Sequence, residues 1–319
     1  MKTRPFKQVD VFTDQPYFGN PLAVVLDGSG LDDEAMQRFA RWTNLSETTF
    51  VLPTVDSAAD YRVRIFTPGG ELPFAGHPTL GSCHAWLQAG GTPKRLDFIV
   101  QECQVGLVNI RREGERLAFA APPLQRSAPS PAVLAQVAAA LGLKAPQIQA
   151  AQLLDNGPVW LGLLLDSADT VLQLQPDHAA LKKHGLKVGV VGAHPAQAAP
   201  VLIARANREA RAFSGSTHPS PAEAAAADFE VRGFAAPIGI EEDPVTGSLN
   251  ASVAQWLIAE GHAPERYVAA QGTCLGRAGR VYLTRETDAQ GSTQATSTGS
   301  GQVWVGGQSV TCIDGTVTL

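Results

Sequence analysis

The feature that most constrains the fold of this chain is an internal repeat. Residues 63–91 (VRIFTPGGELPFAGHPTLGSCHAWLQAGG) and 231–261 (VRGFAAPIGIEEDPVTGSLNASVAQWLIAEG) both open on Val-Arg-x-Phe, cross a loop with proline, glycine and acidic residues, and end in a predicted helix that contains Trp-Leu. A short match means little alone, but strand, loop and helix recur in the same order with both ends in register. The period of ~170 residues indicates a duplicated domain and not a solenoid.

Strand patterns dominate both halves, with a few helices between them. One helix is predicted after a cap at Asp32, with Met36, Phe39 and Ala40 on its inner face. Further helices are predicted at 78–88, 132–141 and 248–260. Alternating or continuous apolar runs between turn signals predict the strands 6–12, 22–26, 49–52, 61–66, 98–100, 106–111, 159–165, 187–191, 229–234 and 303–305.

The proline- and serine-rich residues 121–131 are the best candidate for a linker between the halves. We therefore expect an N-terminal lobe at 1–125 and a C-terminal lobe at 126–319, with a cleft between them. The last strand either completes the second lobe or returns to the first. Residues 214–227 predict a loop or short helix, and residues 288–302 a surface hairpin.

Composition excludes several functional classes. The chain is 44% hydrophobic with a net charge of −5 and no lysine-arginine block, so it can bury a core and does not read as a nucleic-acid-binding protein. No apolar run reaches the ~20 residues that span a bilayer, and the N-terminus lacks a signal-peptide pattern, so we expect a cytoplasmic protein without membrane partners. No CxxC pair is present, which disfavours zinc and disulfide frameworks; the four cysteines are Cys83, Cys103, Cys274 and Cys312.

In each repeat, small residues lie where the loop enters the helix. The first has Gly76 before His77 and Pro78, and the second has Gly247 before Ser248. Helix starts carry unpaired N–H groups and partial positive charge, and glycine allows a ligand to approach them. Two such starts facing each other would bind a small carboxylate. The alternative is two ordinary helix starts, with Pro78 and Ser248 in positions they favour anyway.

Three titratable residues lie near these loops. His77 and Asp243 could bind a ligand or exchange protons, although each alone is more often a cap or turn residue. Glu47 lies between a helix and a strand, and its spacing alone suits a solvated loop carboxylate. It becomes an acid/base group if the fold brings it to the cleft, where we expect burial to raise its pKa toward neutrality.

Signature blocks over most of the chain identify a family. They resemble those of the PhzF-like isomerases of phenazine biosynthesis and occur in the same order: Phe18-Gly19-Asn20-Pro21-Leu22-Ala23-Val24-Val25, Asn44-Leu45-Ser46-Glu47-Thr48, Phe66-Thr67-Pro68, Glu71 to Gly81, Glu242-Asp243-Pro244-Val245-Thr246-Gly247-Ser248, Gln271-Gly272 and Gly276-Arg277. Residues 121–228 and those from 288 onward match no block.

The resemblance implies a diaminopimelate-epimerase-like α+β fold. This fold has two similar lobes, each a strongly curved, mostly antiparallel sheet wrapped round a central helix. The central helices would be those predicted at 78–88 and 248–260. The family also implies a homodimer and an isomerase that needs no cofactor and no metal.

The resemblance further implies roles for site residues. Glu47 would act as base and then acid, moving a proton between carbons of a small carboxylated, unsaturated or cyclic substrate. His77 and Asp243 would assist as the other catalytic residues. The backbones of Gly76, Gly247 and Ser248, with the Ser248 hydroxyl, would hold the substrate carboxylate.

Two alternatives remain on the same fold. A racemase or epimerase of this fold uses a cysteine at each helix start, and the positions near His77 and Gly247 hold none; Cys83 lies deeper in its helix and suits core packing. A cysteine-independent epimerase is therefore one alternative. A non-catalytic binding or interaction protein is the other, since a fold does not determine a function.

Overall fold

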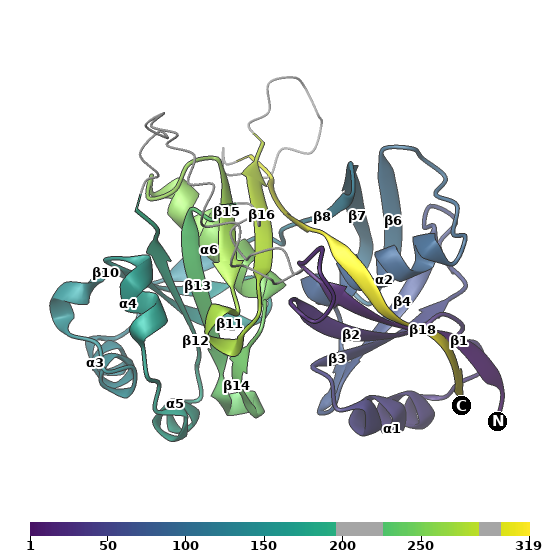
Figure 1. Cartoon of the computed structure of the whole chain (residues 1–319), viewed down its shortest axis with the longest axis horizontal. Coiled ribbons are helices and arrows are strands. Elements are labelled where there is room, and N and C mark those ends of the chain that lie inside the picture. Colours follow the sequence, from purple (N-terminus) through teal and green to yellow (C-terminus); the bar gives the residue numbers. More distant parts are fainter. Residues whose placement is uncertain (196–225, 287–300) are drawn as a thin grey trace, which may run out of the picture.

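The computed structural model describes residues 1–195, 226–286 and 301–319. It is α+β, with two halves side by side (Figure 1). The N-terminal half contains β1 (Thr3–Val11), β2 (Asn20–Val25), α1 (Asp33–Thr43), β3 (Glu47–Leu52), β4 (Tyr61–Thr67), β5 (Gly70–Leu72), α2 (Gly76–Gln88), β6 (Phe98–Cys103), β7 (Gly106–Glu113) and β8 (Arg116–Ala120).

The C-terminal half has the same plan with additional helices on its outer face. After β9 (Gln125–Ser127), the last strand of the N-terminal unit, it contains α3 (Pro131–Ala140), β10 (Ile148–Asp155), β11 (Val159–Leu165), α4 (Ala168–Gln173), α5 (His178–His184), β12 (Lys187–Ala193), β13 (Phe229–Ala235), β14 (Ile240–Asp243), α6 (Gly247–Ala259), β15 (Arg266–Gln271), β16 (Gly279–Arg285), β17 (Val303–Gly307) and β18 (Ser309–Thr318).

The strand pairing shows that the repeat extends well beyond the matching sequence. In the N-terminal half β1 pairs antiparallel with β2, β2 parallel with β3, β3 antiparallel with β4, and β4 parallel with β6, which continues antiparallel through β7 to β8. Strands β10 to β17 repeat this order, with β14 in the place of β5. Each half is therefore one copy of the same folding unit.

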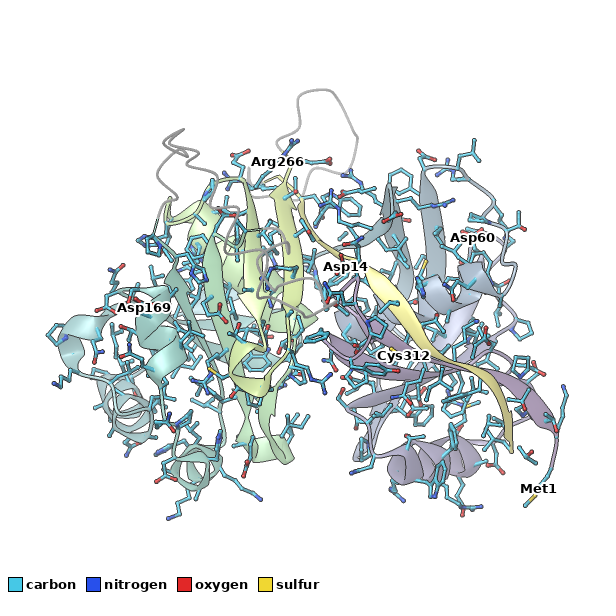
Figure 2. All side chains as sticks on the ribbon, in the orientation of Figure 1. Met1, Asp14, Asp60, Asp169, Arg266 and Cys312 are labelled. Carbon is cyan, nitrogen blue, oxygen red and sulfur yellow. The ribbon has the colours of Figure 1, made fainter. Side chains whose placement is uncertain are left out.

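The two halves exchange their last strands. β9 pairs with β10 of the second half, and β18 pairs with β1 of the first. Figure 2 shows β18, which carries Cys312, lying along the N-terminal half. Of the two alternatives for the last strand, the structure has the return to the first lobe. The predicted linker is corrected, because residues 121–131 include the paired strand β9; the lobe boundary at residue 125 stays a prediction.

The two central helices are α2 and α6. α2 packs against β1, β2, β3, β6 and β8, and α6 against β10, β11, β16 and β17. Both are buried on most sides, which their apolar sequences without a polar stripe require. Because β8 also pairs with β17, sheet and core run continuously from one half to the other. The predicted α+β fold, with two similar lobes that each have a sheet packed around one central helix, is confirmed.

The predicted helix starts and the Trp-Leu register need correction. α2 and α6 begin at Gly76 and Gly247, earlier than predicted. Counted from these glycines, Trp256 comes one position sooner than Trp86, which rotates its side chain by ~100°. Trp86 consequently stacks on Tyr61 with ring centroids 5.0 Å apart, whereas Trp256 is fully buried. The glycines, and not the tryptophans, are the equivalent points of the two repeats.

The first predicted helix is confirmed in detail. The Asp32 side chain accepts a hydrogen bond from the Ala35 N–H, and Met36, Phe39 and Ala40 are buried. The predictions for residues 214–227 and 288–302 fall almost entirely outside the described residues. None of the helices in the described part of the chain has the length and apolar run that crossing a bilayer requires.

Candidate active site

The starts of the two central helices meet between the halves. A Cβ atom placed on Gly247 would lie 3.1 Å from the backbone nitrogen of His77. A Cβ atom on Gly76 would lie 2.2 Å from the Phe119 ring. Both glycines are buried. Glycine at 247 therefore lets α6 approach α2 this closely, and glycine at 76 leaves room for the Phe119 ring. The unpaired N–H groups of the two helix starts gather in one place.

Glu47 and His77 form a hydrogen-bonded pair at this junction. Glu47 is the first residue of β3, and His77 is in the first turn of α2. His77 Nδ1 lies 3.0 Å from Glu47 Oε2, and His77 Nε2 lies 3.0 Å from the Asn20 carbonyl oxygen. A carbonyl only accepts, so Nε2 carries a hydrogen. The contact at Nδ1 then requires one more proton, which Glu47 and His77 share.

Asp243 reaches the same junction from the other half. Its carboxylate accepts hydrogen bonds from Asn20 Nδ2 at 3.0 Å and from Thr246 Oγ1 at 2.7 Å. Asn20 also donates to the Val245 carbonyl at 2.8 Å. Asn20 thus contacts His77 through its backbone and Asp243 through its side chain. One buried residue therefore links titratable side chains of both halves.

The two carboxyl groups have opposite shifts in pKa. Burial raises the pKa of Glu47, but the hydrogen bond and positive charge of His77 outweigh it, so the net pKa is lowered. Burial and the negative charge of Glu47 raise the pKa of Asp243 to about 6. The expected rise for Glu47 is therefore wrong, because a cationic partner stabilises its ionised form. Asp243 is the group whose pKa approaches neutrality.

Ser248 lies at the start of α6 with its hydroxyl partly accessible. Trp160 Nε1 donates to Ser248 Oγ at 3.2 Å, and Asn156 Nδ2 donates to the Ser248 carbonyl at 3.0 Å. Since Oγ accepts from Trp160, its own hydrogen is free to point to another acceptor. The hydroxyl and the helix start together suit a carboxylate oxygen.

The structure thus brings together all six residues chosen from the sequence, while their roles stay predictions. Three further neighbours were missed. Asn20 and Gln271 stand in recognised blocks, but nothing local marked them as joining the halves; Gln271 accepts from Thr246 N at 3.0 Å and donates to its hydroxyl at 2.9 Å. Lys187 stands in no block, and only its electrostatic influence on Glu47 and Asp243 marks it.

Thiol chemistry and metal binding have no visible site at this junction. Cys83 is fully buried inside α2, and burial raises the pKa of its thiol to about 12. The helix starts themselves carry His77 and Ser248. Among the described residues, no group of histidine, cysteine and acidic side chains is arranged to hold a metal ion.

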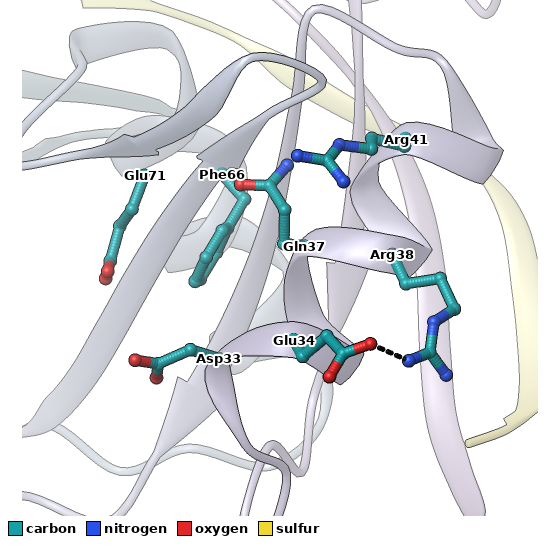
Figure 3. Close-up of a pocket in the computed structure, with 7 residues that line it drawn as sticks. All are labelled: Asp33, Glu34, Gln37, Arg38, Arg41, Phe66 and Glu71. Atoms are coloured by element: carbon teal, nitrogen blue, oxygen red, sulfur yellow. Dashed lines mark hydrogen bonds and ion pairs between the residues drawn. The ribbon is translucent and has the colours of Figure 1, made fainter.

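A surface pocket elsewhere lacks comparable chemistry. Figure 3 shows it beside α1, where Glu34 pairs with Arg38 at 2.5 Å. Glu71 is likewise paired, with Arg64. The pocket's charges are largely neutralised by such exposed pairs, and it contains no site residue. Its lining residues are Asp33, Glu34, Gln37, Arg38, Arg41, Phe66 and Glu71.

Replacing Asp243 with asparagine is expected to change how stability depends on pH. Folding raises the pKa of Asp243 from 3.8 to about 6, so the folded state binds its proton more tightly than the unfolded state. Wild-type stability should therefore fall as pH rises from about 4 to about 6, by at most ~3 kcal/mol from this group.

Chemical denaturation of both proteins between about pH 4 and pH 7 measures this difference. The variant should gain stability relative to wild type as pH rises. Asp169→Asn is the control, because Asp169 is exposed on α4 and its removal should leave the wild-type pH dependence intact. Parallel curves for Asp243→Asn and wild type would contradict the assignment.

The fold and this junction define a class of protein: two-lobed proteins built from a duplicated unit, with titratable side chains where the central helices of the two lobes meet. The sequence matches the PhzC-PhzF family, described as "Phenazine biosynthesis-like protein", over residues 9–315. The chain belongs to this family, and the enzyme class supported by its relatives is isomerase.

Relatives and solved structures agree with this assignment. The chain is 36% identical to "Antisense-enhancing sequence 1" of Schizosaccharomyces pombe, over 99% of both chains. It is 32% identical to a "Trans-2,3-dihydro-3-hydroxyanthranilate isomerase" of Pseudomonas aeruginosa, over 94% of this chain and 97% of the relative. The structure of a PhzF family protein of Bacillus anthracis matches with a TM-score of 0.77 at 22% identity, covering 100% of both chains. A predicted epimerase of Pseudomonas aeruginosa matches with a TM-score of 0.72 at 27% identity, covering 99% of both.

Proposed function

We propose that the chain isomerises a small carboxylated, unsaturated or cyclic substrate by moving one proton between two of its carbons, with Glu47 as the acid/base group. The observation that carries the proposal is the 3.0 Å contact between Glu47 Oε2 and His77 Nδ1 at the meeting point of the helix starts; a single proton between the two groups satisfies this contact. When this proton resides on His77, Glu47 is a carboxylate with low solvent exposure, ready to act as a base.

The reaction conserves all atoms. Glu47 takes a proton from one carbon, and the electron pair of the broken C–H bond enters the conjugated system. Glu47 then returns the proton to another carbon of that system. The N–H groups around Gly76, Gly247 and Ser248 hold the substrate carboxylate and stabilise the negative charge that develops there. Asp243, with its pKa raised to about 6, assists as a hydrogen-bonding partner that is protonated in part of the molecules.

The first substrate to try is trans-2,3-dihydro-3-hydroxyanthranilate, because relatives from two Pseudomonas species carry its name in theirs. It is a cyclic, unsaturated carboxylate and therefore fits the chemistry above. Incubation in deuterated water tests the reaction. We expect isomerised product, with deuterium at the new C–H position to the extent that Glu47 exchanges its proton with solvent.

Other outcomes of this incubation separate the alternatives. Deuterium at the original carbon without a shift of the double bond would replace the isomerase with a cysteine-independent epimerase. Binding without exchange or turnover would favour a non-catalytic binding protein. We also propose that the protein is cytoplasmic and forms a homodimer. A sedimentation profile of a monomer at micromolar concentration would rule out the homodimer.

A further inference from the structure

The duplication gives Glu47 a counterpart in the second half. In the first half Thr48 pairs with Phe66, and in the second Val188 pairs with Phe234. The two phenylalanines occupy the same place in the Val-Arg-x-Phe repeat. The residues just before Thr48 and Val188 are Glu47 and Lys187, each the first residue of its strand. Equivalent positions of the two halves therefore carry opposite charges.

The start of β12 places Lys187 next to the start of α6. A Cβ atom on Gly189 would lie 2.2 Å from Leu249 Cδ1, so this face of β12 packs directly under the first turn of α6. Lys187 is two residues earlier and hence on the same face. Its Nζ lies 5.3 Å from the centroid of the Trp160 ring, and Trp160 Nε1 donates to Ser248 Oγ at 3.2 Å.

This position matches that of Glu47. Glu47 contacts His77 in the first turn of α2, and Lys187 is joined through Trp160 to Ser248 in the first turn of α6. The strand pairing agrees, because Leu22 faces Glu47 in the first half and Trp160 faces Lys187 in the second. The duplicated site thus has an acid/base end and a cationic end.

The ammonium group of Lys187 is partly removed from water. The residue is half-buried. Burial lowers the pKa of Lys187 and outweighs the charges of Asp243 and Glu47, which raise it. The ammonium group lies over the face of the Trp160 ring, and it forms no ion pair with a carboxylate among the described residues. A desolvated cation without an ion-pair partner is stabilised by an anionic ligand.

The charge of the whole junction leads to the same conclusion. Glu47 and Asp243 would repel an anionic substrate when both are ionised. Lys187 supplies a positive charge close enough to affect both carboxyl groups. A substrate carboxylate bound at the α6 start would lie beside this charge, which offsets part of the repulsion.

We propose that Lys187 is a specificity-determining residue, whose ammonium group binds the carboxylate of the substrate together with the start of α6. This inference rests on the proposed function and deepens it. The two halves of one duplicated site have diverged, so that the first transfers the proton and the second anchors the anion.

Calorimetry with a matched ligand pair tests the proposal. Anthranilate and its uncharged amide, anthranilamide, differ mainly in the charged group. Wild type should prefer anthranilate, and Lys187→Met should lose roughly 10- to 100-fold in affinity for anthranilate and little for anthranilamide. Lys187→Arg should retain most of the preference. Lys183→Met, at an exposed lysine of α5, should behave as wild type.

Steady-state kinetics adds a readout that a merely structural role would not move. With a carboxylate substrate that the enzyme converts to product, Lys187→Met should raise KM and leave kcat nearly unchanged. The proposal is overturned if Lys187→Met keeps the preference for anthranilate, if it weakens both ligands equally, or if wild type has no preference. The binding role of Lys187 and the proposed isomerase activity can be tested separately. If Lys187→Met loses the preference for anthranilate but the wild-type protein gives no deuterium exchange, the carboxylate-binding role is supported and the isomerase activity is rejected.

Discussion

Replacing Glu47 with glutamine is expected to lower kcat by roughly 10²- to 10⁴-fold, the usual contribution of a positioned acid/base group. Glutamine has the same shape as glutamate and can still hydrogen-bond to His77, but it cannot take a proton from carbon. Affinity for a carboxylate such as anthranilate should change little, because the groups proposed to bind it lie around the two helix starts. Steady-state kinetics and calorimetry on the same preparation measure both effects.

Glu34→Gln is the control for this substitution. Glu34 is exposed on α1, where it pairs with Arg38, and its replacement should leave both turnover and binding as in wild type. If Glu47→Gln turns over substrate at more than about a tenth of the wild-type rate, the acid/base assignment fails. If it loses binding and thermal stability together, Glu47 has a structural role.

Replacing Arg232 with methionine should destabilise the protein far more than the equivalent replacement of Arg64. The repeat places both arginines alike: Arg232 bonds Glu242 at 3.0 and 2.8 Å, and Arg64 bonds Glu71 at 2.7 and 2.7 Å. Exposure distinguishes them, since the side chains are 5% and 8% exposed in the second half but 17% and 19% in the first.

Arg232 also donates to two backbone carbonyls of α4 and its end, those of Val171 and Leu174, at 3.1 and 2.9 Å. Removing it leaves Glu242 as a buried charge without its partner, so we expect a loss of about 3–5 kcal/mol in the free energy of unfolding. Arg64→Met should cost about 1 kcal/mol, because water can still solvate Glu71. Chemical denaturation of the two variants compares them directly, and equal losses would show that burial does not control the strength of these pairs.

Much of the fold was predictable because it depends on local patterns. The capped helix with Met36, Phe39 and Ala40 inside follows from amphipathic spacing. The two central helices follow from apolar segments, although they begin at Gly76 and Gly247 and not at the predicted positions 78 and 248. The repeat predicted two similar lobes, since Val-Arg-x-Phe and the acidic loop recur at a half-chain period. The resemblance to a family supplied Glu47, His77 and Asp243, which spacing alone left as turn and loop residues.

The pKa order of the two carboxyl groups needed the tertiary structure. Sequence reasoning expected burial to control Glu47, but His77 lies 3.0 Å away and reverses the net effect. Asp243 instead accepts from the uncharged side chains of Asn20 and Thr246, and burial together with the charge of Glu47 raises its pKa to about 6. A pKa depends on which charges lie within a few ångströms, and these residues are far apart in the chain.

By itself, therefore, the sequence determined the duplication and the apolar segments of the central helices, because propensity and periodicity act between near neighbours. The α+β fold and the roles of the site residues were implied by the family resemblance. Only the tertiary structure decided that β9 and β18 are exchanged between the halves and that Asn20 joins the halves. It also decided that Lys187 occupies the position of the second half that is equivalent to that of Glu47 in the first. The physical reason is that strand register and long-range electrostatics depend on how the chain packs. The long segment between β12 and β13 separates Lys187 from the recognisable repeat that begins at Val231, so a local sequence comparison does not align Lys187 with Glu47.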